Sequence, residues 1–92
     1  MRIISQNGIT DIPYDLYGVR QLKSDLSKII AFTNGDEFLI MAEYSTKAKA
    51  KKAMEMLRNE YMQYATAKSE DYWFAFDYPK VFQFPADEDV EV

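Results

Sequence analysis

The sequence predicts a single α+β domain in which an antiparallel sheet of about five strands carries one long helix on one face. Three observations support this fold class. Residues 45–65 have the periodicity of a long helix, two Asn-Gly pairs each separate runs of strand-forming residues, and residues 72–78 read as an extended aromatic strand. Residues 1–85 are expected to form the domain, followed by an acidic tail at residues 86–92.

The helix is expected to begin after Tyr44. Ser45 or Thr46 can cap it, because a side-chain hydroxyl accepts a hydrogen bond from an unpaired N–H group of the first turn. Apolar residues then recur at spacings of three and four, which places them on one face. They are Ala50, Ala53, Met54, Leu57, Tyr61, Tyr64 and Ala65. This stripe should pack on one face of the sheet.

Strands are expected on both sides of the helix. Asn7-Gly8 lies between two short runs and suits a two-residue type I′ turn, because that turn needs residues that tolerate positive φ. Residues 14–22 fit either a third strand or an irregular turn, and the strand is favoured. After the helix, Pro79 and Pro85 bracket a short strand that should lie at a sheet edge.

A second hairpin is indicated around Asn34-Gly35. Residues 28–33 and 38–44 flank this pair and are rich in β-branched and aromatic residues. These two strands should form the centre of the sheet. The near-continuous apolar run at 38–42 predicts that most of the second strand is buried.

The composition excludes several kinds of chemistry. The 92 residues include no cysteine and no histidine, which removes thiolate chemistry, the usual zinc ligand sets and the side chain best suited to proton transfer near pH 7. We therefore expect no metal site, no cofactor and no enzymatic activity. The net charge of −4 resides in residues 86–92, which should be disordered and solvated, and nucleic-acid binding is not expected.

The chain has neither a secretory signal at its N-terminus nor an apolar run of the roughly 18 residues that a membrane span requires. The sequence therefore predicts a cytoplasmic protein that does not enter a membrane.

A lysine cluster marks the start of the helix. It consists of Lys47, Lys49, Lys51 and Lys52. A helix N-terminus carries unpaired N–H groups and partial positive charge, so these lysines could help to bind an anion or an acidic partner surface. The alternative is an exposed face that keeps the protein soluble, since Lys-Ala repeats also favour helix formation.

The end of the helix and the strand predicted after it contain more aromatic residues than one buried stripe on the helix requires. Tyr61, Tyr64, Tyr72 and Trp73 are the candidates for contacts with a partner or with a second copy of the chain. Core packing is the alternative for the run at 72–84. Stacking on nucleic-acid bases is disfavoured, because Lys80 is the only basic residue from 70 to 92.

Three segments stand out as sequence signatures: the opening MRIISQNG, the central AEYST that leads into KAMEMLR, and the closing VFQFP. Together they resemble a family of small proteins encoded by prophages and mobile elements of Gram-positive bacteria. Relatives often have acidic residues in the first helical turn, where this chain has Lys47, Ala48 and Lys49. The resemblance implies a phage or mobile-element accessory protein, and counter-defence, including inhibition of CRISPR effectors, is the expectation it brings.

Two functions are therefore considered. The first is a non-enzymatic protein that binds a host protein. The alternative is a homo-oligomeric sponge for nucleotides or other small anions, with lysines such as Lys47, Lys51 and Lys52 lining sites between subunits. Stabilisation by nucleotides in a thermal-shift experiment would distinguish the second from the first.

Overall fold

The fold consists of six strands, one long helix and two short 3₁₀ turns over the part of the chain that the computed structural model describes, residues 1–33, 38–70 and 80–92. Over residues 64–70 the description covers the backbone alone. The elements in chain order are β1 (Arg2–Ile4), β2 (Asp11–Pro13), a 3₁₀ turn (Tyr14–Leu16), β3 (Gly18–Leu22), β4 (Asp25–Phe32), β5 (Phe38–Glu43), α1 (Lys47–Glu70), β6 (Val81–Gln83) and a second 3₁₀ turn (Asp87–Asp89).

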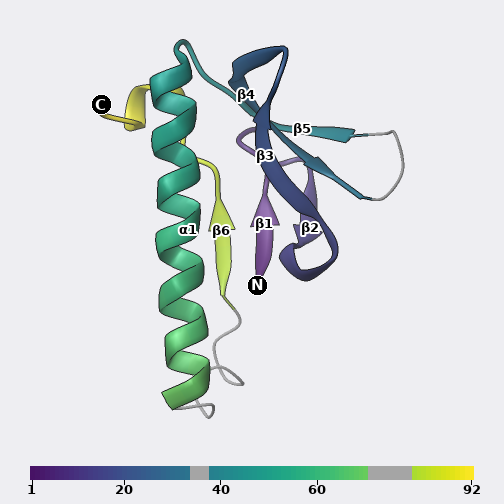
Figure 1. Ribbon diagram of the computed structural model, residues 1–92, viewed down its shortest axis with the longest axis vertical. Helices are drawn as coiled ribbons and strands as arrows, with labels where there is room; N and C mark the ends of the chain where they lie inside the picture. The colour runs from purple at the N-terminus through teal and green to yellow at the C-terminus, as the bar shows by residue number, and fades with distance from the viewer. Residues whose placement is uncertain (34–37, 71–79) are drawn as a thin grey trace.

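The strands form two separate sheets, each with three strands (Figure 1). One has the order β2-β1-β6 and the other the order β3-β4-β5. The predicted α+β class and long helix are confirmed, whereas the prediction of one antiparallel sheet of about five strands is wrong. Strand β6 lies parallel to β1, with Ile3 opposite Phe82, because the chain returns to β1 only after passing along the helix. As predicted, β6 is a short edge strand.

Gln6 is the point at which the two sheets meet. Its backbone N–H donates to the carbonyl oxygen of Met41 over 2.7 Å, and its side-chain Oε1 accepts from the N–H of Glu43 over 3.1 Å. One residue just after β1 thus pairs with the last part of β5. Because the chain turns away directly afterwards, the two sheets touch at this residue and do not merge.

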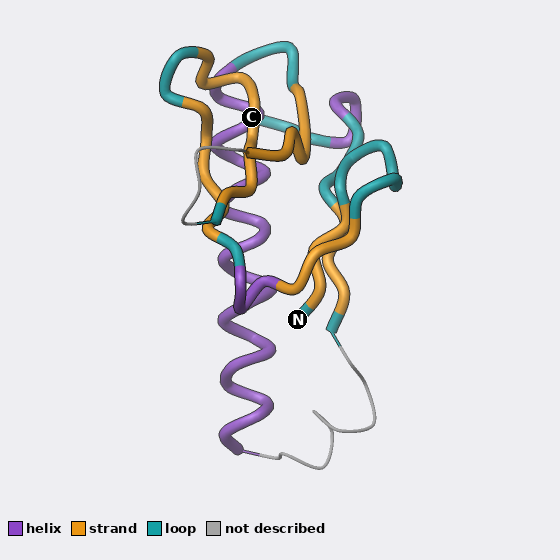
Figure 2. The backbone as a smooth tube through the Cα atoms, turned by 90° about the vertical axis from the view of Figure 1, so that its right-hand side faces the viewer, coloured by secondary structure: helices purple, strands orange, loops and turns teal. Residues whose placement is uncertain are grey.

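The helix begins as the sequence predicts. The Thr46 hydroxyl accepts a hydrogen bond from the N–H of Lys49 over 3.1 Å, which is the expected cap. Ala50, Ala53 and Leu57 are fully buried, and the helix packs against β4 and β3. The helix of 24 residues spans roughly 36 Å, and Figure 2 shows its last turns extending past the strands.

Both sheets and the helix share one hydrophobic core. Strand β4 and the end of β5 contribute Ile29, Ala31 and Met41, and the other sheet contributes Ile3 and Phe82. The last residues of the chain also enter this core. The remaining members are Ile12, Ala42, Tyr44, Ala50, Ala53, Met54, Leu57, Phe84 and Val90. Because a single core serves both sheets, they form one folding unit.

The connection between β1 and β2 differs from the predicted two-residue turn. It runs from Ser5 to Thr10, and Gly8 has a φ of 77°, but Asn7 does not have the positive φ that a type I′ turn requires. Ser5 is buried and its hydroxyl donates to Asn7 Oδ1 over 2.6 Å. The same hydroxyl accepts from the N–H of Thr10. These side-chain bonds hold a longer loop in place of the tight turn.

Residues 14–22 combine both structures that the sequence allows. A 3₁₀ turn at Tyr14–Leu16 precedes the favoured strand, which is β3 and begins at Gly18. A Cβ atom at Gly18 would overlap the ring of Phe32 on the neighbouring strand, so a larger residue there would displace that ring. The ring of Phe32 also lies 5.1 Å from the guanidinium carbon of Arg20.

Strand β5 departs most from expectation. Residues of β4 and β5 form the predicted antiparallel pair, but β5 lies at the edge of its sheet. Phe38, Leu39 and Ile40 are 48%, 40% and 40% exposed, so the prediction of a buried central strand is wrong. Asn34-Gly35 and the predicted strand at 72–78 lie outside the described residues.

Replacement of Leu57 by alanine tests whether the apolar stripe of α1 is its buried face. Leu57 is 0% exposed, so Leu57→Ala should lower the free energy of unfolding by about 2–5 kcal/mol, through lost burial and a residual cavity. Urea unfolding followed by circular dichroism measures this loss. Met62→Ala is the matched control on the same helix, because Met62 is 62% exposed and its truncation should change stability by less than about 0.5 kcal/mol. Equal losses in the two variants would contradict the assignment of the buried face.

Candidate functional site

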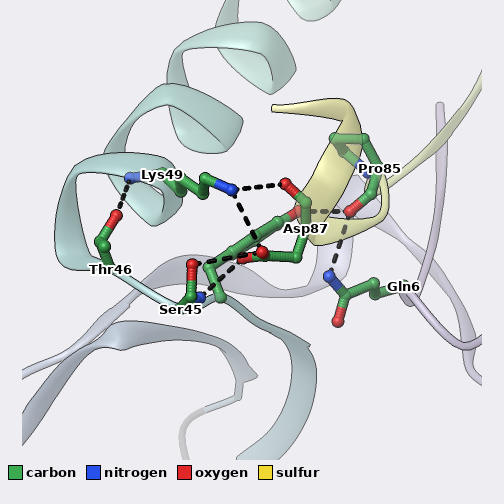
Figure 3. A network of polar contacts seen from close by, with 7 residues as sticks. Gln6, Ser45, Thr46, Lys49, Pro85 and Asp87 are labelled. Carbon is green, nitrogen blue, oxygen red and sulfur yellow. Dashed lines mark hydrogen bonds and ion pairs between the residues drawn. The ribbon is translucent and has the colours of Figure 1, made fainter. Parts of the chain in front are cut away.

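The lysine-rich start of the helix is occupied by a carboxylate from the same chain (Figure 3). Asp87 accepts hydrogen bonds from the N–H and the hydroxyl of Ser45, at 2.7 and 3.2 Å. Lys49 Nζ donates both to the Asp87 carboxylate, at 3.1 Å, and to the Asp87 carbonyl oxygen, at 3.0 Å. The helix start therefore carries an anion, as its chemistry predicts, but the anion is Asp87.

The electrostatics of this contact are favourable. The backbone N–H of Ser45 and then the ammonium of Lys49 hold the pKa of Asp87 below its ordinary value of 3.8. The carboxylate also offsets the unfavourable interaction between lysines and the positive end of the helix dipole. Lys49 thus has a structural role, and its ammonium group is engaged within the chain.

Two further bonds fix the segment that carries Asp87. The Tyr44 hydroxyl donates to the carbonyl oxygen of Pro85 over 2.8 Å, and Gln6 Nε2 donates to the same oxygen over 3.2 Å. Burial, and then the nearby Asp87 carboxylate, raise the pKa of Tyr44, so this hydroxyl stays protonated as a donor. Pro85 and Asp87 are thereby attached to the loop after β1, the loop after β5 and the first turn of α1.

Residues 86–92 differ from the disordered tail that their charge predicts. Asp87 is bonded to the helix start, and Val90 is buried in the core. The physical reason is that Val90, which follows the acidic residues, has an apolar surface to bury. The four-carboxylate segment therefore includes both a specific ion pair and a core residue.

The other predicted lysines do not converge with Lys49. Lys47 and Lys51 are exposed, and Lys52 lies 4.0 Å from Glu55 on its own helix. The carbonyl oxygen of Lys47 accepts from Gln21 Nε2 over 3.3 Å. Anion binding by Lys47, Lys51 and Lys52 between subunits remains a prediction.

One predicted interface aromatic is described in full. The ring of Tyr61 lies edge to face with that of Tyr14, with centroids 5.1 Å apart, and beside them is a surface hollow of about 350 Å³ that Asp15 also lines. Tyr61 is 37% exposed. The side chain of Tyr64, and Tyr72 and Trp73, lie outside the described residues.

The open edge of β5 is the surface that sequence reasoning missed. Phe38, Leu39 and Ile40 are three consecutive apolar residues, all exposed, on a strand whose other side pairs with β4. Among the described residues, Gln6 bonds to this edge at Met41 and Glu43. The sequence feature that could have indicated this surface is the apolar run that follows the Asn34-Gly35 pair. An apolar run alone, however, does not distinguish a buried strand from an exposed one.

Two surface hollows are lined in part by residues of β5. The first, of about 150 Å³, is lined by Tyr17, Ala31, Phe32, Thr33, Phe38 and Leu39. The second, of about 340 Å³, is lined by Gln6, Asn7, Ile40, Met41, Ala42 and Glu43. We call Phe38–Ile40 with these two hollows the β5 edge surface.

Comparisons with family models, curated proteins and solved structures find no match to this chain. In the described part of the chain, no helix has the length and apolar character that crossing a membrane would require. Functional inference therefore depends on the geometry of the surfaces described above.

Replacement of Asp87 by asparagine tests the contact at the helix start. Asp87→Asn should lower the urea midpoint at pH 7, because the charge that Lys49 and the helix start bind is lost. Since the folded-state pKa of Asp87 lies below 3.8, the carboxylate stabilises the fold fully above that pH. Its contribution disappears as pH falls through the lower folded value. The difference between wild type and Asp87→Asn should therefore narrow as the pH falls below about 4.

The matched control is Glu88→Gln, which removes an exposed carboxylate from the adjacent position. Its urea midpoint at pH 7 should equal that of the wild type. A midpoint for Asp87→Asn that matches the wild type at pH 7 would contradict the structural role of the carboxylate.

Proposed function

We propose that this chain is a non-enzymatic accessory protein that acts by binding another protein through the β5 edge surface. The observation that carries the proposal is the exposure of Phe38, Leu39 and Ile40 on an open strand edge. An edge strand presents unpaired N–H and C=O groups, and natural proteins usually protect such edges with charge, proline or short length. An unprotected apolar edge is suited to adding a strand from a partner.

The other edge strands are shorter or more buried than β5, which supports β5 as the binding edge. Among the described strands, β2 and β6 are edges of only three residues each, and β2 includes Pro13. The edge strand β3 carries Arg20 and is half-buried throughout. Strand β5 alone combines an edge position with three successive exposed apolar side chains.

The class of partner comes from the sequence resemblance. Small accessory proteins of prophages and mobile elements bring the expectation that the partner is a host protein, and that binding serves counter-defence. Stoichiometric binding requires no nucleophile, base or metal, which agrees with a composition that has neither cysteine nor histidine. Because Asp87 engages Lys49, the alternative of a sponge for small anions would depend on Lys47, Lys51 and Lys52.

A charge placed on the β5 edge tests the proposal. Ile40→Lys puts an ammonium group where Ile40 is 40% exposed and should reduce affinity for the partner by more than about tenfold, because strand addition would leave that charge poorly solvated. The partner is first identified by cross-linking in the host and affinity purification. Its affinity for the purified variants is then measured by biolayer interferometry.

Val81→Lys is the matched control, since Val81 is 50% exposed on the other sheet's edge strand β6. It should bind the partner as the wild type does. Equal binding by Ile40→Lys and the wild type, or failure to recover any partner, would overturn the proposal. Circular dichroism confirms that both variants are folded.

A further inference from the structure

The β3-β4-β5 sheet has a second face, on the side opposite α1. Successive side chains of a strand point to opposite faces, and Ile29 and Ala31 of β4 belong to the core that α1 shares. Ile30 and Phe32 therefore point to the other face, and neither is a member of that core. Ile30 is nevertheless only 1% exposed, so this second face includes a buried apolar residue of its own.

The strand register defines the residues of this face. Arg20 on β3 and Ile40 on β5 are the partners of Ile30, and directly opposed residues project to the same face. Phe38 on β5 is likewise the partner of Phe32. We call Arg20, Ile30, Phe32, Phe38 and Ile40 the outer face. Phe38 and Ile40 are 48% and 40% exposed, so the outer face is continuous with the β5 edge surface.

Gly18 determines how Phe32 lies on the outer face. Gly18 is the β3 partner of Phe32, and the Phe32 ring occupies the place that a Cβ atom of residue 18 would take. The ring therefore leans across β3, away from Phe38 on β5. The guanidinium carbon of Arg20 is 5.1 Å from the centre of this ring, which is within the range of a cation–π contact. Phe32 thereby holds Arg20 against the sheet.

The charge of Arg20 differs from that of comparable basic residues. Four bases are half-buried in the described part of the chain: Arg20, Lys28, Lys49 and Lys80. Each of the three lysines forms an ion pair with a carboxylate of the same chain. Within the same described residues Arg20 forms none, and its Nη1 donates to the neighbouring carbonyl oxygen of Gln21 over 3.4 Å. A purely apolar surface that covered the outer face would bury this charge unpaired, which is unfavourable.

We infer that the partner protein covers the outer face as well as the β5 edge, with an apolar group over Phe38 and Ile40 and a carboxylate that binds Arg20. The inference rests on the proposed function and names the chemistry of the partner. A guanidinium binds a carboxylate through paired, charge-assisted hydrogen bonds, and arginine is enriched at the centres of protein interfaces. Charge complementarity therefore selects an acidic residue on the partner.

The sheet sets the distance between the two recognised groups. Neighbouring strands lie about 4.8 Å apart and β3 is two strands from β5, so the carboxylate lies roughly 10 Å from the apolar group. A strand added at β5 would run along the far side of β5 from Arg20. The carboxylate therefore belongs to a different segment of the partner, one that packs over the sheet.

Two small probes with the same apolar body and opposite charge test this chemistry. They are 6-phenylhexanoate and 6-phenylhexylammonium, whose phenyl ring and charged end are separated by a length comparable to that between β5 and β3. Binding is followed by NMR titration of the full chain, at the methyl groups of Ile30 and Ile40 and at the Nε–H group of Arg20. The carboxylate should shift these resonances and bind about two- to fivefold more tightly than the ammonium.

Variants of Arg20 separate a charge effect from simple apolar binding. Arg20→Gln should abolish the preference for the carboxylate, and Arg20→Glu should reverse it. Lys23→Gln is the matched control, because Lys23 is exposed in the turn between β3 and β4, and it should keep the wild-type preference. Circular dichroism confirms that the variants are folded. Shifts confined to other residues, a preference that Arg20→Glu does not reverse, or no binding at millimolar probe would each overturn the inference.

Other occupants give different results. Tighter binding of oligothymidylate than of 6-phenylhexanoate, lost in Arg20→Gln, would identify the outer face as a platform for single-stranded nucleic acid and would overturn the inference. Self-association that Arg20→Glu removes, seen as a concentration-dependent mass in sedimentation, would show that a second copy covers this face. That result would overturn the inference too.

The purified partner separates the inference from the proposed function. Arg20→Gln should weaken its binding by more than about tenfold, because a desolvated arginine–carboxylate pair loses one member. Arg20→Lys introduces an amine at this position, and a carbodiimide should join that amine to a carboxylate of the partner, with the link located by mass spectrometry. If Ile40→Lys loses the partner whereas Arg20→Gln binds it as the wild type does, the proposed function stands and the inference fails. If Ile40→Lys retains the partner, both fail.

Discussion

The contact between Asp87 and the start of the helix organises this fold. One carboxylate accepts hydrogen bonds from Ser45 and Lys49, and so joins the end of the chain to the end of the loop that follows β5. With Asp87 fixed, Val90 reaches the core, and the Pro85 carbonyl oxygen meets Tyr44 and Gln6. A segment whose composition is typical of disorder thus becomes part of the structure, because its charge and its apolar residue each find a partner.

Gln6 has a comparable role between the sheets. It pairs with β5 at Met41 and Glu43, and thereby connects a sheet with mixed strand directions to one that is antiparallel. The same contact limits how much of the β5 edge is covered. Gln6 does not pair with Ile40 or with the residues of β5 before it. The first half of β5 therefore has an open edge and three exposed apolar side chains. Exposure of β5 therefore follows from where β1 ends.

The two candidate surfaces have different physical characters. At the helix start, the ammonium group of Lys49 already binds a carboxylate within the chain. On the side of β5 that faces away from β4, the first half of the strand meets no other strand among the described residues. Exposed apolar surface contributes more to binding another protein than an ion pair that is already satisfied, and this difference favours β5 as the site of contact.

The sequence by itself determined the α+β class, the long helix with a cap at Ser45 or Thr46, burial of Ala50, Ala53, Met54 and Leu57, the antiparallel β4–β5 pair and the short edge strand at Val81–Gln83. These features depend on local periodicity and on nearby residues. Only the tertiary structure decided that six strands form two sheets, that Phe38–Ile40 lie at an edge, and that Asp87 binds Lys49. The physical reason is that each of these depends on contacts between residues far apart in the chain. An apolar run has the same local pattern whether a neighbouring strand covers it or not, and a carboxylate gives no local sign of the lysine it will meet.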